Sequence, residues 1–309
     1  MAKALCLFSG GLDSILAVKL LQEQAIKVTG LTFVSCFFNA TIPEKMAAKI
    51  SLPLRVVDIS SEHLTIVKDP RYGYGKNMNP CLDCHLMMLK KAGEMMRREG
   101  FDFVATGEVL GERPFSQNES ALKLLEKKSS LEGYLLRPLS AKLLASTIAE
   151  NRSIVGRDKL MDISGRSRQK QMALAQQYNL EDYPTPAGGC LLTDPAFGQR
   201  LKEMFNKWPQ ADIEDMELLK VGRNFWHEDV LCVVGRNHKE NQQLKKISRT
   251  KDILVEPDNV AGPTVLIRFK KTLDRAVKNE LIKLAEGLIK KYMNQKYQDK
   301  NIEFLVEFF

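Results

Sequence analysis

The sequence lacks the segments that would carry a protein into or across a membrane. None of its apolar runs approaches the ~20 residues that a membrane-spanning helix needs. Its N-terminus has no basic region followed by a long apolar stretch, so it does not read as a secretory signal. It also has no internal repeat and no low-complexity tract. These absences predict a globular cytoplasmic protein, and 309 residues are enough for two domains.

Cysteines are few, with six in the whole chain. In a cytosolic protein they are more often free, catalytic or metal-bound than paired in disulfides. Three of them lie in apolar, strand-like runs and are expected to be small buried hydrophobes: Cys6, Cys36 and Cys232. The other three lie beside glycine- or proline-rich turns and are candidates for chemistry.

Acidic residues are outnumbered, with 38 Asp and Glu against 46 Lys and Arg, which gives a net charge of +8 at pH 7. A basic protein suits an anionic partner such as RNA. Residues 219–251 carry eight basic and three acidic side chains. A charged run is also typical of an ordinary solvated face, so this patch supports RNA binding only weakly. Its candidate RNA-binding residues are Arg236, Lys239, Lys245 and Lys246.

Residues 9–14, the glycine loop, read Ser-Gly-Gly-Leu-Asp-Ser between a strand-like and a helix-like run. Such a turn is a phosphate site, because backbone N–H groups and the helix N-terminus point at the ligand. A Walker A loop is excluded, since no Lys precedes the final Ser. The alternative is an ordinary capped turn. We expect Asp13 to hold Mg²⁺ and the phosphates to be bound by Ser9, Gly10, Gly11, Asp13 and Ser14.

The first half of the chain alternates apolar runs with helical stretches, which predicts a parallel sheet covered on both faces. Strands are expected at 2–8, 27–34, 54–59 and 103–106, and helices at 15–24, 43–50, 82–99, 142–151, 167–179 and 194–207. The fold class is therefore α/β, a doubly wound parallel sheet over residues 1–207. Ligands bind such sheets at the carboxyl ends of the strands. Thr106 and Gly107 should border a nucleotide there, and Phe33 should contact its adenine ring or lie in the core.

The pattern changes from about residue 208. Short strands are expected at 218–221, 230–234, 253–255 and 265–269, followed by a helix at 273–297 and a strand at 303–308. This succession predicts a separate, smaller α+β domain over residues 208–309.

Cys81 and Cys84 stand at the start of a predicted helix, a location that lowers thiol pKa values and leaves the sulfurs accessible. Cys190 follows two glycines, where the backbone can approach another group closely. Zinc needs four ligands, and His85 is the only nearby addition. Three thiolates suit a 4Fe–4S cluster with one open iron. A redox pair and a structural zinc site are the alternatives.

Several segments carry a family resemblance. The glycine loop resembles the SGGxDS loop of the PP-loop ATP pyrophosphatases, which have an adenine nucleotide alpha-hydrolase-like fold and cleave ATP to AMP and pyrophosphate. Residues 79–84 (NPCLDC) and 105–108 (ATGE) resemble the tRNA thiouridine synthetases of the 4-thiouridine (ThiI) and 2-thiouridine (MnmA) types. Residues 106–117 are similar to the TGExxGQxxSQ segment of the ThiI type, with Glu112 in place of Gln and one extra residue. Together these segments make residues 2–200 similar to that family.

The second domain carries a different resemblance. Residues 234–241 and 261–268 resemble the NFACT-R type of RNA-binding domain. The sequence shows neither the THUMP region nor the rhodanese-like domain of the usual 4-thiouridine enzyme. The C-terminal module, or a partner, is therefore expected to help hold the RNA.

The resemblance implies an ATP-dependent tRNA sulfurtransferase that adenylates a uridine carbonyl and replaces its oxygen by sulfur, giving 4-thiouridine in preference to 2-thiouridine. It implies ATP, Mg²⁺ and a 4Fe–4S cluster as cofactors, and tRNA and a sulfur donor (sulfide or a cysteine desulfurase) as partners. A persulfide on one cysteine is the competing route for sulfur. The predicted catalytic residues are Asp13 and the three cysteines that would hold the cluster, Cys81, Cys84 and Cys190.

Two other classes of protein carry similar features. A PP-loop ligase for another tRNA modification does not require the three cysteines. A nucleotide- and RNA-binding module without catalysis would use them for a structural zinc ion. Iron and sulfide analysis together with an assay for AMP release separates the three classes.

Overall fold

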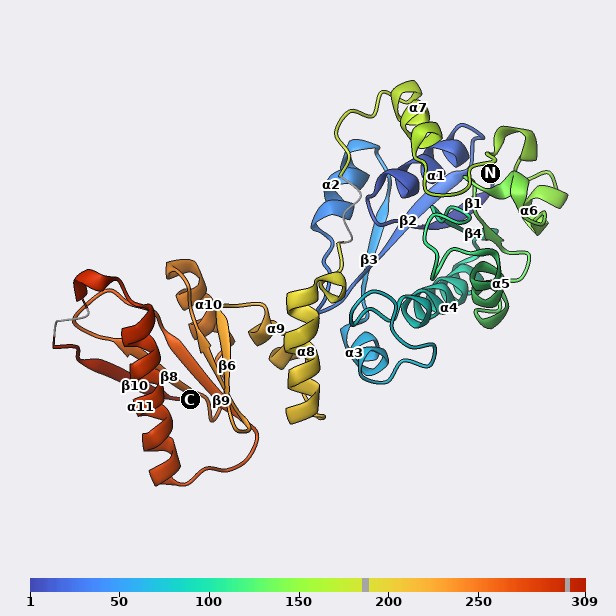
Figure 1. Ribbon diagram of the computed structural model, residues 1–309. Coiled ribbons are helices and arrows are strands. Elements are labelled where there is room, and N and C mark those ends of the chain that lie inside the picture. The colour runs from blue at the N-terminus through green and yellow to red at the C-terminus, as the bar shows by residue number, and fades with distance from the viewer. Residues whose placement is uncertain (185–188, 298–300) are drawn as a thin grey trace. The chain divides into compact units, whose positions relative to one another are not determined.

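The computed structural model describes residues 1–184, 189–297 and 301–309 and divides into two compact units, Met1–Thr193 and Asp194–Phe309 (Figure 1). This division comes earlier than the boundary predicted after residue 207. Helix α8 (Pro195–Lys207) belongs to unit 2 because it packs against the next helix, α9 (Ile213–Leu219). Across the described residues, none of the helices has the length and apolar character to cross a membrane.

Unit 1 is built on one parallel five-stranded sheet. The strand order reverses between the two strands at its centre, and this switch point is where open α/β sheets bind ligands. The doubly wound parallel sheet predicted from the sequence is confirmed. Its strands, in order across the sheet, are β3 (Leu54–Asp58), β2 (Lys27–Val34), β1 (Lys3–Leu7), β4 (Phe103–Thr106) and β5 (Leu135–Leu136).

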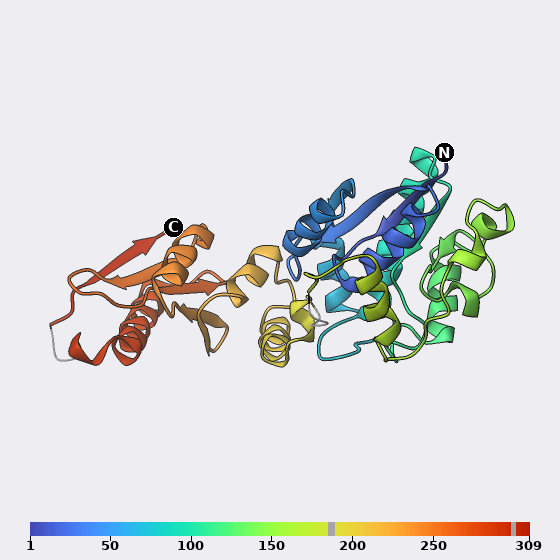
Figure 2. The same cartoon turned by 90° about the horizontal axis from the view of Figure 1, so that it is seen from above.

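Alternate residues along each strand supply two cores, one on each face of the sheet. Ala4 and Cys6 of β1 face the core under α1 and α2, whereas Leu5 faces the core under α4 and α5. The two helical layers can be followed in Figure 2. The helices of unit 1 are α1 (Leu12–Gln22), α2 (Thr41–Lys49), α3 (Ser60–Lys68), α4 (Cys81–Glu99), α5 (Glu119–Lys128), α6 (Ile148–Asn151) and α7 (Gln169–Gln177), with short 3-10 helices at 141–143, 157–159 and 191–193.

Helix α7 runs alongside α1 in the same direction. At their N-terminal ends Arg168 donates to Asp13, with Nη2 3.3 Å from Oδ2. At their C-terminal ends the Tyr178 hydroxyl donates to Glu23 at 2.8 Å. Both contacts join residues 155 positions apart, and apolar side chains pack between the helices. The two helices are therefore in parallel register, and the N-termini of both lie at the glycine loop.

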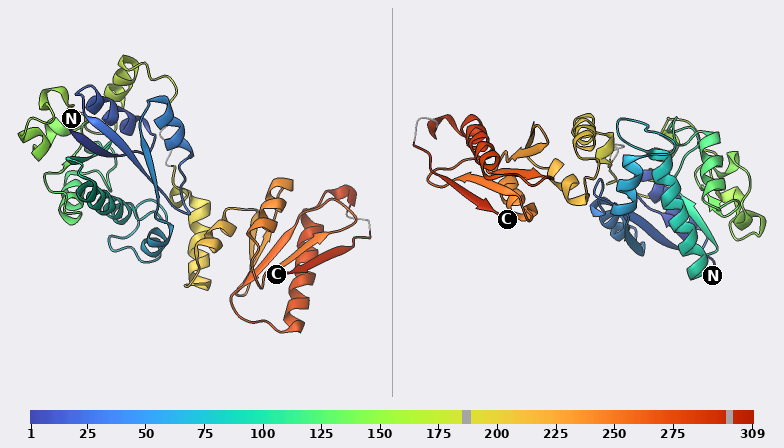
Figure 3. Two further views of the ribbon diagram at one scale, coloured as in Figure 1. Left: turned by 180° about the vertical axis from the view of Figure 1, so that it is seen from behind. Right: turned by 90° about the horizontal axis from the view of Figure 1, so that it is seen from below.

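Unit 2 is an antiparallel five-stranded sheet with helices on both faces (Figure 3). Helix α11 (Arg275–Tyr292) covers one face. Helices α9 and α10 (His238–Ile247) lie on the other face. Residues 295–297 form a short 3-10 helix. The predicted smaller α+β domain is confirmed. Its strands, in order, are β10 (Phe304–Phe308), β8 (Ile253–Pro257), β9 (Val265–Phe269), β7 (Val230–Val234) and β6 (Arg223–His227).

Arg268 of β9 fastens α9 and α10 to this sheet. Its side chain is fully buried, on the face opposite the one that α11 covers. The guanidinium donates to Asp252 at 2.7 Å and to the backbone oxygen of Ile247, the last residue of α10. It also lies 3.4 Å from the carboxylate of Asp215 in α9. Because every charge has a partner, the buried network holds the helices without leaving an ion uncompensated.

Some predicted elements differ from the structure. The strand predicted at 218–221 is wrong, because those residues end α9. That helix is set by a capping box, in which the side chain of Asp212 accepts from the N–H of Asp215 and that of Asp215 accepts in return. Helix α10 was missed because Leu244 is its only buried residue, which leaves almost no apolar periodicity to read. The helix predicted at 142–151 is reduced to a 3-10 turn and α6.

Acid should destabilise unit 1 through His63, a fully buried residue of α3. Burial lowers the pKa of His63 to about 4, below the ~6.5 of an unfolded chain. The unfolded state therefore binds the proton first as the pH falls, and stability is lost between about pH 6.5 and 4. We expect His63 to account for ~3 kcal/mol of the loss in unfolding free energy over this range.

Denaturant titrations at several pH values measure this contribution as the difference between the parent and His63→Leu. The control is His227→Leu, because His227 is exposed at the end of β6. That variant should keep the pH dependence of the parent. Equal pH dependence in the parent and His63→Leu would show that the buried imidazole makes no such contribution.

Candidate functional site

The glycine loop joins the carboxyl end of β1 to α1, as the sequence predicts. Gly10 has a φ of +72°, and a Cβ there would lie 3.0 Å from the backbone of Pro43, so the position requires glycine. The Ser14 hydroxyl donates to the backbone oxygen of Gly11 at 2.8 Å and lies 3.3 Å from the Ser9 hydroxyl. Gly11 is the N-cap of α1, and its side chain cannot cap it. The first N–H groups of the helix are therefore left for a bound anion.

The end of β4 lies directly against the glycine loop. A Cβ on Gly107 would come 2.6 Å from the backbone nitrogen of Ser14 and 2.8 Å from the backbone oxygen of Asp13. Any side chain at this position would displace the loop. Thr106, one residue earlier, is buried beside it. Both predicted residues of β4 are thus placed at the loop.

Phe33 lies in the core and not at the loop surface. Its ring is 6% exposed and belongs to the apolar cluster that contains Leu5, Leu31 and residues of α4. An adenine ring needs an accessible aromatic face for stacking, and so little exposed surface does not offer one. Of the two roles considered for Phe33, the structure favours the core.

Asp13 is the charged centre of the loop. Burial raises the pKa of its carboxyl, and the charges of Arg168 and Arg113 offset part of this rise. Its Oδ1 is buried and has no hydrogen-bond partner among the described residues. Burial also raises the pKa of Glu112, and the nearby charge of Asp13 raises it further. A free carboxylate oxygen beside a second carboxyl is a donor set that suits Mg²⁺, so these residues fit the predicted ion.

Cys81 and Cys84 occupy the first turn of α4. Cys84 is buried, and its thiol pKa is raised strongly by burial and further by the charges of Cys190 and Cys81. Cys81 is half-buried; burial raises its thiol pKa, while the charge of Arg113 lowers it. The low thiol pKa expected at a helix N-terminus is therefore wrong for both, because desolvation outweighs the helix dipole.

Loop contacts bring Cys190 to the same place. The side-chain amide of Asn77, in the loop before α4, donates to the backbone oxygen of Thr193 at 2.7 Å. The Thr193 hydroxyl in turn donates to the backbone oxygen of Cys190, also at 2.7 Å. The pKa of the Cys190 thiol is raised to about 11, mainly by burial and partly by the charge of Cys81. Since such charge effects require proximity, the three thiols share one neighbourhood.

The thiols do not form a metal-binding group in this arrangement. Within residues 1–184, 189–297 and 301–309, no three His, Cys, Asp or Glu side chains are placed to hold a metal ion. His85, the candidate fourth zinc ligand, places its Nδ1 3.2 Å from a carboxylate oxygen of Glu108. Three soft thiols are suitable donors for an iron–sulfur cluster, but their placement does not fit one. The 4Fe–4S cluster stays a prediction.

Glu108 connects the thiols with the glycine loop. Burial opposes its ionisation, but the charge of Arg137 and the hydrogen bond with His85 outweigh burial and hold the pKa of Glu108 at about 2. Arg137 Nε and the Thr106 hydroxyl donate to the same carboxylate oxygen at 3.0 and 3.1 Å. Glu108 follows the glycine that touches the loop, and His85 follows Cys84. The network therefore ties the start of α4 to the end of β4.

Arg113 provides a second connection. Its charge lowers the pKa values of both Asp13 and Cys81, so the glycine loop and the thiols border the same space. Sequence analysis did not identify Arg113, Arg168 or Gln171 as site residues. Arg113 follows Glu112 in the segment 106–117, whose family resemblance could have identified it. Arg168 and Gln171, at the start of α7, are brought to the loop only by the fold, so the sequence gives no sign of them.

The three remaining cysteines are buried, as expected for packing residues. Burial raises the pKa of the Cys6 and Cys232 thiols to about 12. Both lie in strands, Cys6 in β1 and Cys232 in β7. Cys36 is buried just after β2. None of the three carries the features of a reactive thiol.

The four predicted RNA-binding residues lie on or beside α10 in unit 2 and are not equivalent. Arg236 and Lys245 each form an ion pair with a glutamate at 2.6 Å. Lys239 and Lys246 are exposed, and neither forms an ion pair with the described part of the chain. They stand seven residues apart, which is about two helical turns, so they share one side of α10.

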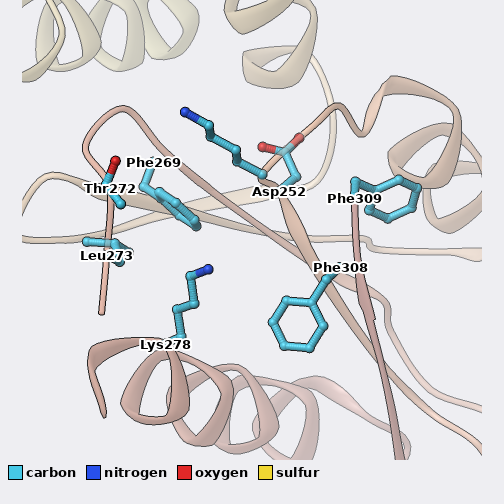
Figure 4. A pocket seen from close by; sticks show the side chains of 8 residues that line it. Asp252, Phe269, Thr272, Leu273, Lys278, Phe308 and Phe309 are labelled. Atoms are coloured by element: carbon cyan, nitrogen blue, oxygen red, sulfur yellow. The ribbon is translucent and has the colours of Figure 1, made fainter. Parts of the chain in front are cut away.

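Unit 2 also has a small pocket that contains none of the predicted site residues (Figure 4). It lies between the start of α11 and β10, and its walls combine apolar side chains with two lysines. The glycine loop and the thiols, by contrast, all belong to unit 1. The pocket is lined by Lys251, Asp252, Phe269, Thr272, Leu273, Lys278, Phe308 and Phe309.

Two family models match the chain, one in each unit. Residues 2–155 match the tRNA methyl transferase HUP domain, and residues 222–307 match the NFACT protein RNA binding domain. The solved structure of a 4-thiouridine synthetase–RNA complex with bound ATP is 18% identical, with a TM-score of 0.37, and the match covers 58% of this chain and 52% of that one.

Curated relatives match different shares of the chain. The tRNA-specific 2-thiouridylase MnmA of Chloroflexus aggregans is 34% identical over 125 residues, which is 35% of each protein. MnmA 1 of Syntrophus aciditrophicus is 24% identical over 314 residues, or 94% of this chain and 75% of that protein. The chain thus spans about a third of the former relative and three quarters of the latter. The chain is thus similar to the tRNA methyl transferase HUP domain and to 2-thiouridylases in its first unit, and to the NFACT RNA binding domain in its second.

Proposed function

We propose that the protein is an ATP-dependent tRNA sulfurtransferase, which replaces a uridine carbonyl oxygen by sulfur. The observation that supports this most is the chain of contacts from the glycine loop through Gly107 and Glu108 to His85, which adjoins Cys84. An enzyme that activates a base with ATP and then thiolates it needs its nucleotide loop and its sulfur-bearing group around the same reacting atoms. The glycine loop and the thiols of unit 1 meet this requirement.

In the first step the uracil oxygen attacks the α-phosphorus of ATP. A new P–O bond forms, the bond between the α-phosphorus and the bridging oxygen breaks, and pyrophosphate leaves with that electron pair. The N–H groups of the glycine loop and the hydroxyls of Ser9 and Ser14 bind the phosphates and offset the developing charge. Asp13 and Glu112 would hold Mg²⁺, which supplies further charge neutralisation when bound.

In the second step sulfur attacks the activated carbon and AMP leaves with the former carbonyl oxygen. Cys81 and Cys190 are the half-buried thiols, whereas Cys84 is buried. One of the two half-buried thiols accepts a persulfide sulfur from a cysteine desulfurase, and this terminal sulfur forms the C–S bond. The other attacks the inner sulfur, so that the S–S bond breaks and a disulfide remains. A dithiol reductant then restores both thiols.

The names of the relatives support one position of thiolation. Sequence analysis favoured the 4-oxygen, but the curated relatives are named 2-thiouridylases. We therefore assign the exchange to the 2-oxygen of uridine. Mass spectrometry of tRNA nucleosides from a deletion strain distinguishes the two, since the missing nucleoside is 2-thiouridine or 4-thiouridine.

Unit 2 supplies affinity for tRNA in this proposal. Its match to an RNA-binding domain model and the exposed lysines of α10 support that role. Phosphate contacts of this kind position a nucleic acid without reading its sequence. The choice of uridine would then rest with the site of unit 1.

ATP cleavage should give AMP and pyrophosphate and should depend on the close contact at Gly107. Asp13→Ala removes the carboxylate beside the phosphates, and Gly107→Ala places a Cβ 2.6 Å from the loop backbone. Both variants should lower AMP formation at least ~100-fold, the usual scale for loss of a charge-stabilising group. Chromatography of the nucleotides measures it.

The matched control for the glycine variant is Gly287→Ala in α11, where an added Cβ meets nothing within 4 Å. That variant should form AMP at the parent rate. ADP as the product, or parent-level activity in Asp13→Ala, would contradict the assignment of the loop.

Thiolation should require the two half-buried cysteines. Cys81→Ala and Cys190→Ala should each lose thiolated tRNA while retaining ATP binding, because the loop does not use the thiols. Cys84→Ala should lose thiolation only if the three thiols hold a cluster. Cys232→Ala is the control, since that thiol is buried in the sheet of unit 2. Parent-level thiolation in Cys81→Ala or Cys190→Ala would remove that residue from the mechanism.

Iron analysis of the parent protein and these cysteine variants, all prepared anaerobically, tests the predicted cluster. A brown protein with about four irons per chain would bear out a 4Fe–4S cluster and replace the persulfide step. An iron-free protein that still thiolates tRNA would leave the persulfide route. Stoichiometric zinc without activity would point to a structural site.

The lysines of α10 should dominate the salt dependence of tRNA binding. Lys239→Ala/Lys246→Ala should weaken binding and reduce the slope of log K against log salt by roughly 1.5, the counterion release of two phosphate contacts. Arg275→Ala/Lys283→Ala is the matched control, because both residues are exposed on α11, across the sheet. Filter binding over a salt series measures both. Identical slopes in the two double variants would mean that α10 is only a solvated face.

A further inference from the structure

Unsatisfied polar atoms gather beside the glycine loop. Of the nine buried side-chain N and O atoms that lack a hydrogen bond among the described residues, four belong to Asp13, Arg168 and Gln171. They are Asp13 Oδ1, Arg168 Nε and both amide atoms of Gln171. Buried polar groups are normally paired, and an unpaired one in a native structure indicates a missing partner. Four in one place indicate a polar ligand.

Gln171 is the clearest of these groups. Its side chain has no exposed surface, and it stands in the first turn of α7. Its side-chain hydrogen bond with Asp13 lowers the pKa of that carboxyl. The geometry of this contact is poor, so neither amide atom has a well-formed hydrogen bond among the described residues. Asp13 and Gln171 therefore keep hydrogen-bonding capacity for a ligand at the loop.

Arg168 forms an ion pair with the carboxylate that would hold Mg²⁺. Its Nη2 lies 3.3 Å from Asp13 Oδ2, at the long end of a charge-assisted hydrogen bond. The charge of Asp13 raises the pKa of Glu112, because two neighbouring carboxylates repel each other unless a positive charge lies near them. Mg²⁺ would meet that need better than one guanidinium, and it would set Arg168 free. The freed guanidinium would then face the phosphates that accompany the ion.

We infer that Arg168 and Gln171 bind the pyrophosphate part of ATP, and that Arg168 exchanges Asp13 for phosphate oxygens when Mg²⁺ arrives. This inference rests on the proposed function only in taking ATP as the substrate. The parallel packing of α7 on α1 supports it, because it brings the first turn of each helix to the same anion.

The chemistry of the step suits these two side chains. As the bond between the α-phosphorus and the bridging oxygen breaks, pyrophosphate takes the electron pair and gains negative charge. A guanidinium donates two parallel N–H groups to such oxygens. The Gln171 amide adds a neutral donor from the same side. Both side chains therefore stabilise the leaving group, whereas the thiols act on the base.

Binding of pyrophosphate, without tRNA, tests the inference. Titration calorimetry in Mg²⁺ should show affinity reduced roughly tenfold to hundredfold in Arg168→Ala, the scale of a hydrogen bond to a charged group. Arg168→Lys should restore part of it, and Gln171→Met should show a smaller reduction. Arg166→Ala is the matched control, since Arg166 is exposed two residues away. It should bind as the parent does.

Binding of Mn²⁺ alone, followed by electron paramagnetic resonance, separates this role from a structural one. Because Arg168 competes with the metal for Asp13, Arg168→Ala should bind Mn²⁺ as tightly as the parent or more tightly. Unchanged pyrophosphate affinity in Arg168→Ala would overturn the inference, and so would parallel loss of Mn²⁺ and pyrophosphate binding. Neither measurement depends on thiolation, so failure of the proposed function would be seen separately, as ATP binding without thiolated tRNA.

Discussion

The site of unit 1 depends on one backbone contact, in which the end of β4 touches the glycine loop with no room for a Cβ at Gly107. This contact places Glu108 beside the loop, where its carboxylate receives Arg137 and His85. His85 in turn adjoins Cys84 at the start of α4. The contact between Gly107 and the first turn of α1 therefore sets the distance between the glycine loop and the thiols.

Charged groups inside the protein fall into two kinds, those with all their partners and those without. Arg268 in unit 2 and Glu108 in unit 1 are buried, and each is surrounded by partners that use its hydrogen-bonding capacity. Such groups hold helices to sheets. Asp13 and Arg168 pair through one oxygen and one nitrogen, and Asp13 Oδ1 and Arg168 Nε have no well-formed hydrogen bond among the described residues. Incomplete pairing is costly in a structural network and is expected where a ligand completes it.

The glycine loop and the cysteines can be recognised from the sequence, but the residues that surround them in the fold cannot. The glycine loop could be predicted because its turn chemistry is local, and β2, β4, β7 and β9 because their apolar runs are continuous. Arg168 and Gln171 reach the loop from 155 positions away or more, a distance that no local pattern spans. The thiol pKa values were misjudged because the helix position can be read from a sequence, whereas burial depends on the packing of the whole unit.

The parallel register of α1 and α7 has a thermodynamic consequence. Two helices that point the same way bring like dipole ends together, and these ends repel each other until an anion lies between them. In the proposed function ATP supplies that anion. Any ligand that binds only the folded state adds RT ln(1 + [L]/Kd), about 2.7 kcal/mol at a hundredfold excess over Kd. Nucleotide would then stabilise the fold of unit 1 in addition to occupying its site.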